Sequence, residues 1–327
     1  MASYSCRSEC KVEPEINSKV GNASFSGHET FVFRYAWLYK AASLIPDDKR
    51  LFSSDDAMVK LGVGKNMVHS IRHWALATKV LSDQSKSRGT ELELTTLGKL
   101  LFSDGTGDPF LEDNNTLWIL HWNLANNTER ATTWAWAFNL FPSTEFTREG
   151  LTAFIKGEIS ARGIKSPSEA TLKRDIDCFV RTYARSRNSK GVTLEDSLDC
   201  PLTELGLLAE DRSASLIRFT RGDRPTLSEE VFVSCLIEFW DRSAGGRETL
   251  SFADIAFGFG SPGVVFRLDE SSLMERLERL DSVTGGALFF GDTSGLKQVY
   301  WPKRTELNLL SRYYQYDTGI SESGGGK

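Results

Sequence analysis

Long apolar runs, paired cysteines and an excess of basic charge are all missing from this sequence, and each absence excludes a class of protein. No stretch approaches the roughly 20 apolar residues of a membrane-spanning helix, and the polar N-terminus lacks the apolar core of a signal peptide. We therefore expect a cytoplasmic protein without membrane contact. The net charge of -5 argues against a protein that coats nucleic acid indiscriminately, because such binding depends on many Lys and Arg contacts to phosphate.

Common catalytic motifs are missing as well. The sequence has neither the Gly-x-x-x-x-Gly-Lys-Ser/Thr phosphate loop nor the Gly-x-Ser-x-Gly elbow of serine nucleophiles. Gly258, Gly260 and Gly263 match the dinucleotide fingerprint by spacing, but no hydrophobic strand precedes them and Pro262 interrupts them. We therefore predict no cofactor and no catalytic residues. A nuclease site assembled from scattered carboxylates stays open as an alternative.

The metal-binding side chains do not form a recognisable site. Cys6 and Cys10 would supply half of one, but no second Cys or His pair follows at zinc-finger spacing. His69 and His73 are four residues apart, yet the basic residues around them oppose a cation and no acidic ligand is close in sequence. The sequence thus predicts unpaired cysteines and no metal site.

The length of 327 residues predicts two or three domains, and 40% hydrophobic residues predict folded ones. The fold class that we expect is mainly α (α+β), with tandem winged-helix or helix-turn-helix units and short β-hairpin wings. The predicted parts are a flexible leader (1–23), an N-terminal winged-helix domain (24–105), an aromatic helical connector (106–145), a second helix-turn-helix domain (146–224), a C-terminal winged-helix-like domain (225–315) and a flexible tail (316–327).

Residues 60–74 form the most distinctive stretch, because a short helix, a glycine-flanked turn and an amphipathic helix are typical of a helix-turn-helix. Val68, Ile71 and Ala75 share one face and should be buried. The opposite face would contact DNA through five residues: Lys65, Asn66, His69, Arg72 and His73. Residues 59–89 hold six basic residues against one acid, which is a local basic patch on an acidic chain. A plain packing module with a solvated face is the alternative.

A similar basic pattern recurs in residues 162–190, which hold eight basic residues against three acids. The predicted helix there buries five residues, namely Leu172, Ile176, Phe179, Val180 and Tyr183. Lys173, Arg174 and Arg181 would lie outside with Asp177, and the three basic residues are the predicted DNA contacts. A basic tail, 185–190, follows. A solvated helix face is again the alternative.

The third unit carries a different charge pattern. Its predicted recognition helix, 270–280, mixes three glutamates with Arg276 and Arg279, and a hairpin resembling a wing follows at 288–301. This balance suits a protein partner or internal packing better than phosphate. The tryptophans of 118–136 are spaced as a buried core that connects domains rather than as a stacking surface for bases.

Near the N-terminus, Thr30 would cap a helix that begins at about Phe31. His28, Glu29 and Arg34 form a candidate functional cluster there. It lacks the second histidine of the zinc-protease pattern, so a structural or binding role is favoured over acid-base chemistry.

Four segments carry a resemblance to a known family. They are Phe-Ser-Gly-His-Glu-Thr-Phe (25–31), Leu-Gly-Val-Gly-Lys-Asn-Met-Val (61–68), Thr-Leu-Lys-Arg-Asp (171–175) and Glu-Asp-Ser-Leu-Asp-Cys-Pro-Leu (195–202). They resemble signature segments of an uncharacterised bacterial family, a domain of unknown function. Its genes often lie beside sulfur-transfer genes of DNA phosphorothioation and phage-defence clusters. The resemblance covers residues 25 to about 315 and implies an accessory protein of DNA modification or defence, with no catalytic residues to carry over.

Together these patterns predict a DNA-binding accessory or regulatory protein of a phosphorothioation-type defence system. Its expected partners are double-stranded DNA and a sulfur-transfer or other defence protein, and a homodimer stays open. One alternative is a protein-interaction adaptor for the sulfur-transfer or defence enzyme, with the winged helices used for packing. A second is a metal-dependent nuclease that uses His28 and Glu29 with distant acids.

Overall fold

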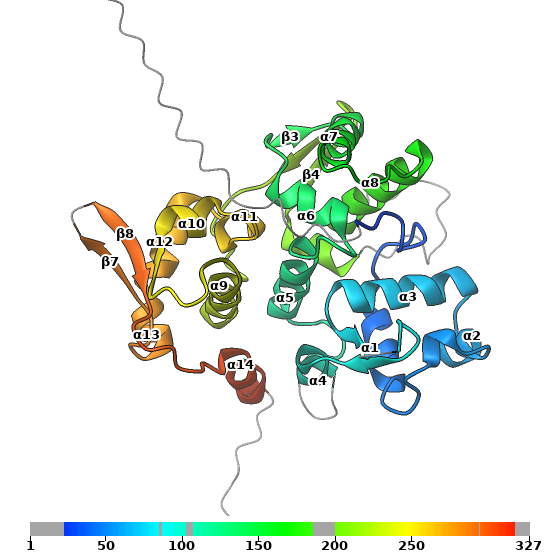
Figure 1. Ribbon diagram of the computed structural model, residues 1–327, viewed down its shortest axis with the longest axis horizontal. Coiled ribbons are helices and arrows are strands. Elements are labelled where there is room, and N and C mark those ends of the chain that lie inside the picture. Colours follow the sequence, from blue (N-terminus) through cyan, green and yellow to red (C-terminus); the bar gives the residue numbers. More distant parts are fainter. Residues whose placement is uncertain (1–22, 85–86, 103–106, 186–199, 294, 318–327) are drawn as a thin grey trace, which may run out of the picture.

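The computed structural model describes residues 23–84, 87–102, 107–185, 200–293 and 295–317. Most of the predicted leader, the basic segment 186–190 and the tail from residue 318 lie outside these ranges. Figure 1 shows the N-terminal elements on one side and the C-terminal elements on the other, with α5 (Asn114–Ala125) and α6 (Thr132–Asn139) between them. The described chain is mixed α/β, mainly helical with small antiparallel sheets, which confirms the coarse fold class.

The N-terminal unit is helical with one hairpin. Its elements are α1 (Tyr35–Leu44), η2 (Leu51–Ser53), α2 (Ala57–Leu61), α3 (Lys65–Ala77), β1 (Leu81–Asp83), β2 (Leu92–Leu94) and α4 (Thr96–Phe102). The turn between α2 and α3 depends on Gly62, whose φ of 66° is left-handed and ends α2. Val68, Ile71 and Ala75 are buried as predicted, so the inner face of α3 packs against the unit's core.

One helix start in this unit was predicted wrongly. Thr30 does not cap α1, which begins at Tyr35, because Thr30 itself has a left-handed φ of 68° and Arg34 precedes the helix in an extended conformation. Helix α2 begins at Ala57 without a side-chain cap, and the Ser54 hydroxyl donates to the Asp56 carboxylate.

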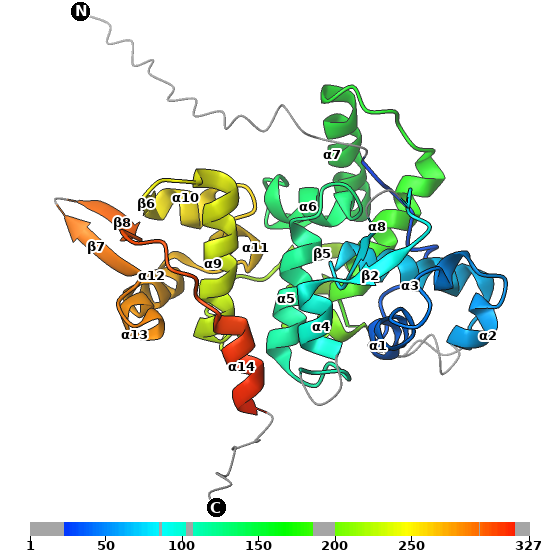
Figure 2. The ribbon, with the colours of Figure 1, turned by 60° about the horizontal axis from the view of Figure 1, so that its bottom comes forward.

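The middle of the molecule is an aromatic core. Helix α5 (Asn114–Ala125) is buried from Asn115 to Ala125, and α6 (Thr132–Asn139) is buried from Thr132 to Phe138. Trp118, Trp122, Trp134 and Trp136 are each 1% exposed, so the prediction that they form a core is confirmed. Asn123 on α5 donates to Thr78 O of the N-terminal unit, and Trp122 on α5 donates to Glu238 of the C-terminal unit. Figure 2 shows α5 between these two sides.

The second unit combines two long helices with a small sheet. Its elements are β3 (Glu145–Phe146), α7 (Arg148–Ala161), α8 (Glu169–Tyr183), η3 (Pro201–Leu205), β4 (Leu208–Asp211) and β5 (Leu216–Phe219). The antiparallel sheet has the order β3-β5-β4, and α7 packs on α8. Ser168 caps α8 by accepting a hydrogen bond from Thr171 N, and the five residues predicted for its buried face are all 0–1% exposed.

The C-terminal unit is built around α9 (Glu229–Ala244). The other elements are β6 (Thr249–Ser251), α10 (Phe252–Phe257), α11 (Pro262–Val265), α12 (Glu270–Glu278), α13 (Leu280–Thr284), β7 (Phe289–Thr293), β8 (Leu296–Tyr300) and α14 (Leu309–Asp317). The predicted hairpin is confirmed: β7 pairs with β8 in antiparallel fashion, with Gly291 opposite Gln298. In the part of the chain described, no helix is both long and apolar enough to cross a membrane.

Candidate nucleic-acid interface

The outer face of α3 presents part of the predicted DNA-contact set. Lys65, Asn66 and His69 are exposed, and the side chain of Lys65 forms no hydrogen bond or ion pair with any residue that the structure describes. Arg72 is only partly exposed, because its Nη2 donates to Gly89 O at 2.9 Å and lies 3.6 Å from Asp83 Oδ1. Arg72 therefore holds the β1–β2 hairpin against α3.

The outward position predicted for His73 is wrong. Its side chain is 9% exposed, and burial lowers the pKa of His73 to about 3, with nearby His28 adding to the effect. A neutral, buried imidazole is not available to DNA. The physical reason is Gly27, which lies so close to the His73 ring that a Cβ atom on it would be 2.5 Å from Nδ1. Residues far from α3 in sequence thus cover this part of the helix.

Helix α8 presents a charged outer face, as predicted. Lys173, Arg174 and Arg181 are exposed, and Asp177 is partly exposed beside them. Arg174, Asp177 and Arg181 follow one another at intervals of three and four residues, which places them on one side of a helix. Lys173 pairs with Glu169 at 2.9 Å, whereas the Arg174 side chain has neither a hydrogen bond nor an ion pair among the described residues.

The inner face of α8 carries a buried carboxylate, Asp175, that the sequence did not single out. It is 1% exposed and accepts hydrogen bonds from Ser26 N at 2.8 Å, from His28 Nε2 at 2.7 Å and from the Thr133 hydroxyl. Three donors around one carboxylate satisfy the charge inside the protein. The loop 26–30 is thereby fixed to α8 from the inside.

The same contacts explain the role of His28, which is fully buried. Burial acts to lower the pKa of His28, and the Asp175 carboxylate, 2.7 Å from Nε2, acts to raise it. Burial raises the pKa of the Cys178 thiol, so this cysteine stays protonated and its Sγ lies 3.5 Å from Phe31 O. Thr30 N donates to His28 Nδ1 at 3.0 Å. The ring therefore links the loop's backbone to Asp175, which is a structural role.

The backbone of this loop is strained. Ser26, Glu29 and Thr30 have left-handed φ values of 83°, 49° and 68°, a conformation that costs a non-glycine residue about 1 kcal/mol or more. The hydrogen bonds to Asp175 and His28 offset this cost. In this conformation the Thr30 carbonyl reaches Arg181 and the Glu29 side chain reaches His69.

On its outer side the loop contacts both basic helices. Arg181 Nη2 on α8 donates to Thr30 O at 2.7 Å, and Glu29 Oε1 lies 3.8 Å from His69 Nδ1 on α3. Both views of the ribbon show this loop between α3 and α8. The two predicted DNA-contact helices therefore lie on either side of one loop.

His28 and Glu29 contact different neighbours, and Arg34 lies against two aromatic rings. His28 is directed inward to Asp175, and Glu29 is directed to His69 on the surface. The guanidinium of Arg34 lies 5.9 and 5.4 Å from the ring centres of Phe31 and Trp37.

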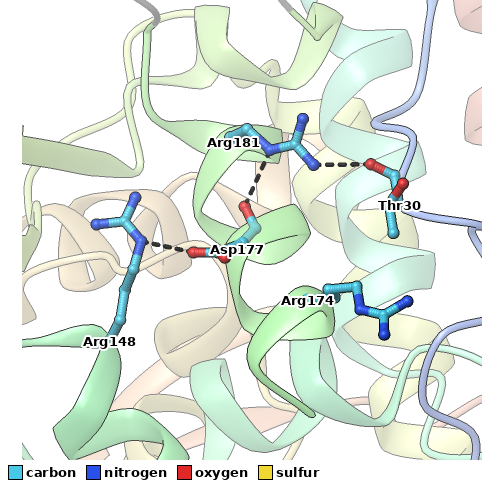
Figure 3. Close-up of a pocket in the computed structure, with 5 residues that line it drawn as sticks. All are labelled: Thr30, Arg148, Arg174, Asp177 and Arg181. Carbon is cyan, nitrogen blue, oxygen red and sulfur yellow. Dashed lines mark hydrogen bonds and ion pairs between the residues drawn. The ribbon is translucent and has the colours of Figure 1, made fainter. Parts of the chain in front are cut away.

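A pocket of about 270 Å³ opens beside the loop, lined by Thr30, Arg148, Arg174, Asp177 and Arg181. Arg148 comes from the first turn of α7, and its Nε donates to Asp177 Oδ1 at 2.9 Å while its Nη1 lies 2.8 Å from Glu210 Oε1. In Figure 3 the Asp177 side chain is joined to Arg148, and no dashed line reaches Arg174. Three guanidinium groups and one carboxylate give the pocket positive charge.

Sequence reasoning missed Arg148 and Asp175. Arg148 lies outside both basic windows, and only the short connection between α7 and α8 hints that its helix packs beside α8. Asp175 appeared as one acid in a basic window. In the ranges that the structure covers, no three or more His, Cys, Asp or Glu side chains are grouped to hold a metal ion.

Comparisons with known proteins agree with the resemblance of the four signature segments. Residues 25–314 match a family described as "Protein of unknown function (DUF4007)". A magnesium-bound crystal structure of SspB has 32% identity and a TM-score of 0.78, with 86% of this chain and 83% of that chain covered. A second SspB crystal structure has 32% identity and a TM-score of 0.77, with 86% and 84% covered. No curated protein matches the chain. This chain belongs to the DUF4007 family.

Proposed function

We propose that this protein binds duplex DNA through one surface, formed by the outer faces of α3 and α8 and the loop 26–30 between them. The observation that carries the proposal is the pair of contacts at that loop, Arg181 to Thr30 O and His69 to Glu29, since they put two basic windows side by side on an acidic chain. Phosphate contacts from such a patch supply affinity.

Within this surface the residues have different roles. Asn66 is exposed on α3 and is the residue that we assign to reading a base edge, because an amide can bond an adenine bidentately. Lys65 and Arg174 contact phosphates. Arg72 belongs to the hairpin rather than to the DNA, since its guanidinium is already bonded to Gly89 O. In this proposal α2, α3 and the β1–β2 hairpin act as a winged-helix unit, and the second and third units repeat the scheme.

We further propose an accessory or regulatory role in DNA phosphorothioation or phage defence. This part is supported by the likeness of the four signature segments to a family whose genes lie in such clusters. The partner would then be a sulfur-transfer or other defence protein.

Charge reversal tests the shared surface. Lys65→Glu and Arg174→Glu should each weaken binding of a short duplex about tenfold, and the double variant should lose about the product, because both residues contact one DNA molecule. Each should also reduce the dependence of log K on log salt by about 0.9. Arg312→Glu on α14 is the control, since Arg312 is exposed on the far unit. Unchanged affinity in the double variant would rule this surface out.

An adaptor role is the second candidate, and the C-terminal unit favours it. Arg276 on α12 is 7% exposed and bonds to the carbonyl oxygens of Asp223 and Arg224, so it does not balance the exposed glutamates of that helix. Large apolar side chains are also exposed nearby in sequence, namely Phe257, Phe289 and Leu296. Retention of a neighbouring gene product by the full chain, combined with no DNA retention, would favour the adaptor.

The magnesium-bound SspB structure motivates one further arm of the DNA experiment. Supercoiled plasmid incubated with the protein and Mg²⁺ reports strand cleavage directly, because one nick relaxes the circle. Cleavage that depends on Mg²⁺ would favour the nuclease alternative, and its persistence in His28→Ala would remove His28 from any catalytic role.

A further inference from the structure

The pocket beside the loop holds positive charge that the residues described by the structure do not fully neutralise. Arg148 is paired with the carboxylates of Asp177 and Glu210. Arg181 donates to two carbonyl oxygens, those of Thr30 at 2.7 Å and Asp177 at 3.4 Å, and forms no ion pair with a carboxylate that the structure describes. Arg174 has no hydrogen bond or ion pair with any described residue. Two guanidinium groups therefore line the pocket without a carboxylate partner in the described part of the chain.

Such an arrangement suits an oxyanion with several acceptor oxygens. A guanidinium is planar and offers paired N–H groups, and this geometry matches two oxygens of a phosphate. The pocket volume of about 270 Å³ is below the range of roughly 300–1,000 Å³ typical of sites that enclose whole organic ligands. A phosphate group with part of its attached sugar is a ligand of the right charge and size.

We propose that this pocket, lined by Arg148, Arg174 and Arg181, is a phosphate-binding subsite. It deepens the proposed function and rests on it in one respect: the phosphate that it takes is a backbone phosphodiester of the bound DNA. Arg174 supplies the main contact because none of its donors is bonded to a described residue. Arg181 is held in place by its hydrogen bond to Thr30 O. Thr30 N is bonded in turn to the His28 ring, which is bonded to Asp175.

Asp177 provides a direct test of the proposed subsite, because its carboxylate lines the same pocket. It orients Arg148 through the 2.9 Å contact to Nε, but it also opposes an incoming anion. The variant Asp177→Asn removes the negative charge and keeps the shape. If the pocket binds phosphate, this change strengthens binding, and a purely structural role for the cluster gives no such gain.

The first measurement uses inorganic phosphate, titrated into the full chain at constant ionic strength and followed by NMR at the arginine Nε–H groups. We expect saturable shifts. Arg174→Gln should weaken binding about tenfold, and Asp177→Asn should strengthen it about fivefold, as expected for one charge at short range near a protein surface. Arg312→Gln, the same change at an exposed site on α14, should leave binding unaltered.

The second measurement repeats the series with a short DNA duplex. It tests whether the phosphate that the pocket binds is a backbone phosphodiester of DNA rather than a free phosphate ion. The proposal expects the same order of affinities and a lower salt dependence for Arg174→Gln. DNA binding that neither pocket variant changes, but that Lys65→Glu still weakens, would overturn the subsite and leave the α3 part of the proposed surface standing. Phosphate binding with the expected order, but without DNA retention, would support the subsite and overturn its DNA source. No phosphate shifts together with no gain in Asp177→Asn would overturn the inference outright.

Discussion

Asp175 and Asp177 lie on opposite faces of α8, and the same substitution at each should have very different consequences. Asp175 accepts hydrogen bonds from Ser26 N, His28 Nε2 and the Thr133 hydroxyl at 1% exposure. A hydrogen bond to a charged group contributes about 1.5–3 kcal/mol, against about 0.5–1.5 kcal/mol for a neutral pair. Asp175→Asn weakens three such bonds by about 1 kcal/mol each, so we expect the free energy of unfolding to fall by about 3 kcal/mol.

Urea denaturation followed by circular dichroism measures this loss for both variants. Asp177 has a half-exposed side chain and one ion pair at the surface, with Arg148, so Asp177→Asn should change the free energy of unfolding by no more than about 0.5 kcal/mol. Asp175→Asn should also lower the pKa of His28, because the carboxylate that helps to raise it is gone. Equal and small losses in the two variants would refute the view that Asp175 anchors the loop.

Two further predictions concern buried groups near this network. Gly27→Ala should destabilise the fold by about 1–3 kcal/mol, since its Cβ would lie 2.5 Å from His73 Nδ1, whereas Gly64→Ala meets nothing within 4 Å and should stay within about 0.5 kcal/mol in the same denaturation assay. Burial lowers the pKa of His121 to about 3, so between pH 6.5 and 4 only the unfolded state takes up a proton at this residue. The free energy of unfolding should therefore fall by about 1.4 kcal/mol for each pH unit in that range. His121→Gln should remove this part of the slope, and an unchanged slope would contradict the assignment.

Local patterns were sufficient to predict the helices that carry the candidate interface. The apolar spacing of α8 gave its buried face correctly, and a glycine at position 62 predicted the turn before α3, because both signals depend only on near neighbours in the chain. His73 failed for the opposite reason. Its position on α3 is outward by helical period, but the segment around Gly27 packs over it, and no local pattern reports a contact across that distance.

The candidate pocket could be predicted only in part. Arg174 and Arg181 were found from charge and period, whereas Arg148 required knowledge of how α7 packs on α8. The Thr30 carbonyl gives no sequence signal at all, since every residue has one. Its position depends on the hydrogen bond between His28 and Asp175, two residues that are 147 positions apart in the sequence.

Helix α8 carries the buried Asp175 on its inner face and the exposed Arg174 and Arg181 on its outer face. Asp175 on the inner face fixes the loop that Arg181 on the outer face contacts, and both belong to one rigid element. A change at Asp175 should therefore reach the pocket by releasing Thr30, although Asp175 itself touches no ligand there. Asp175→Asn should weaken phosphate binding while Arg174 stays intact, and Asp177→Asn should strengthen it. Opposite signs from two neighbouring carboxylates on one helix are hard to produce by general destabilisation, so the pair distinguishes a preformed pocket from a merely charged surface.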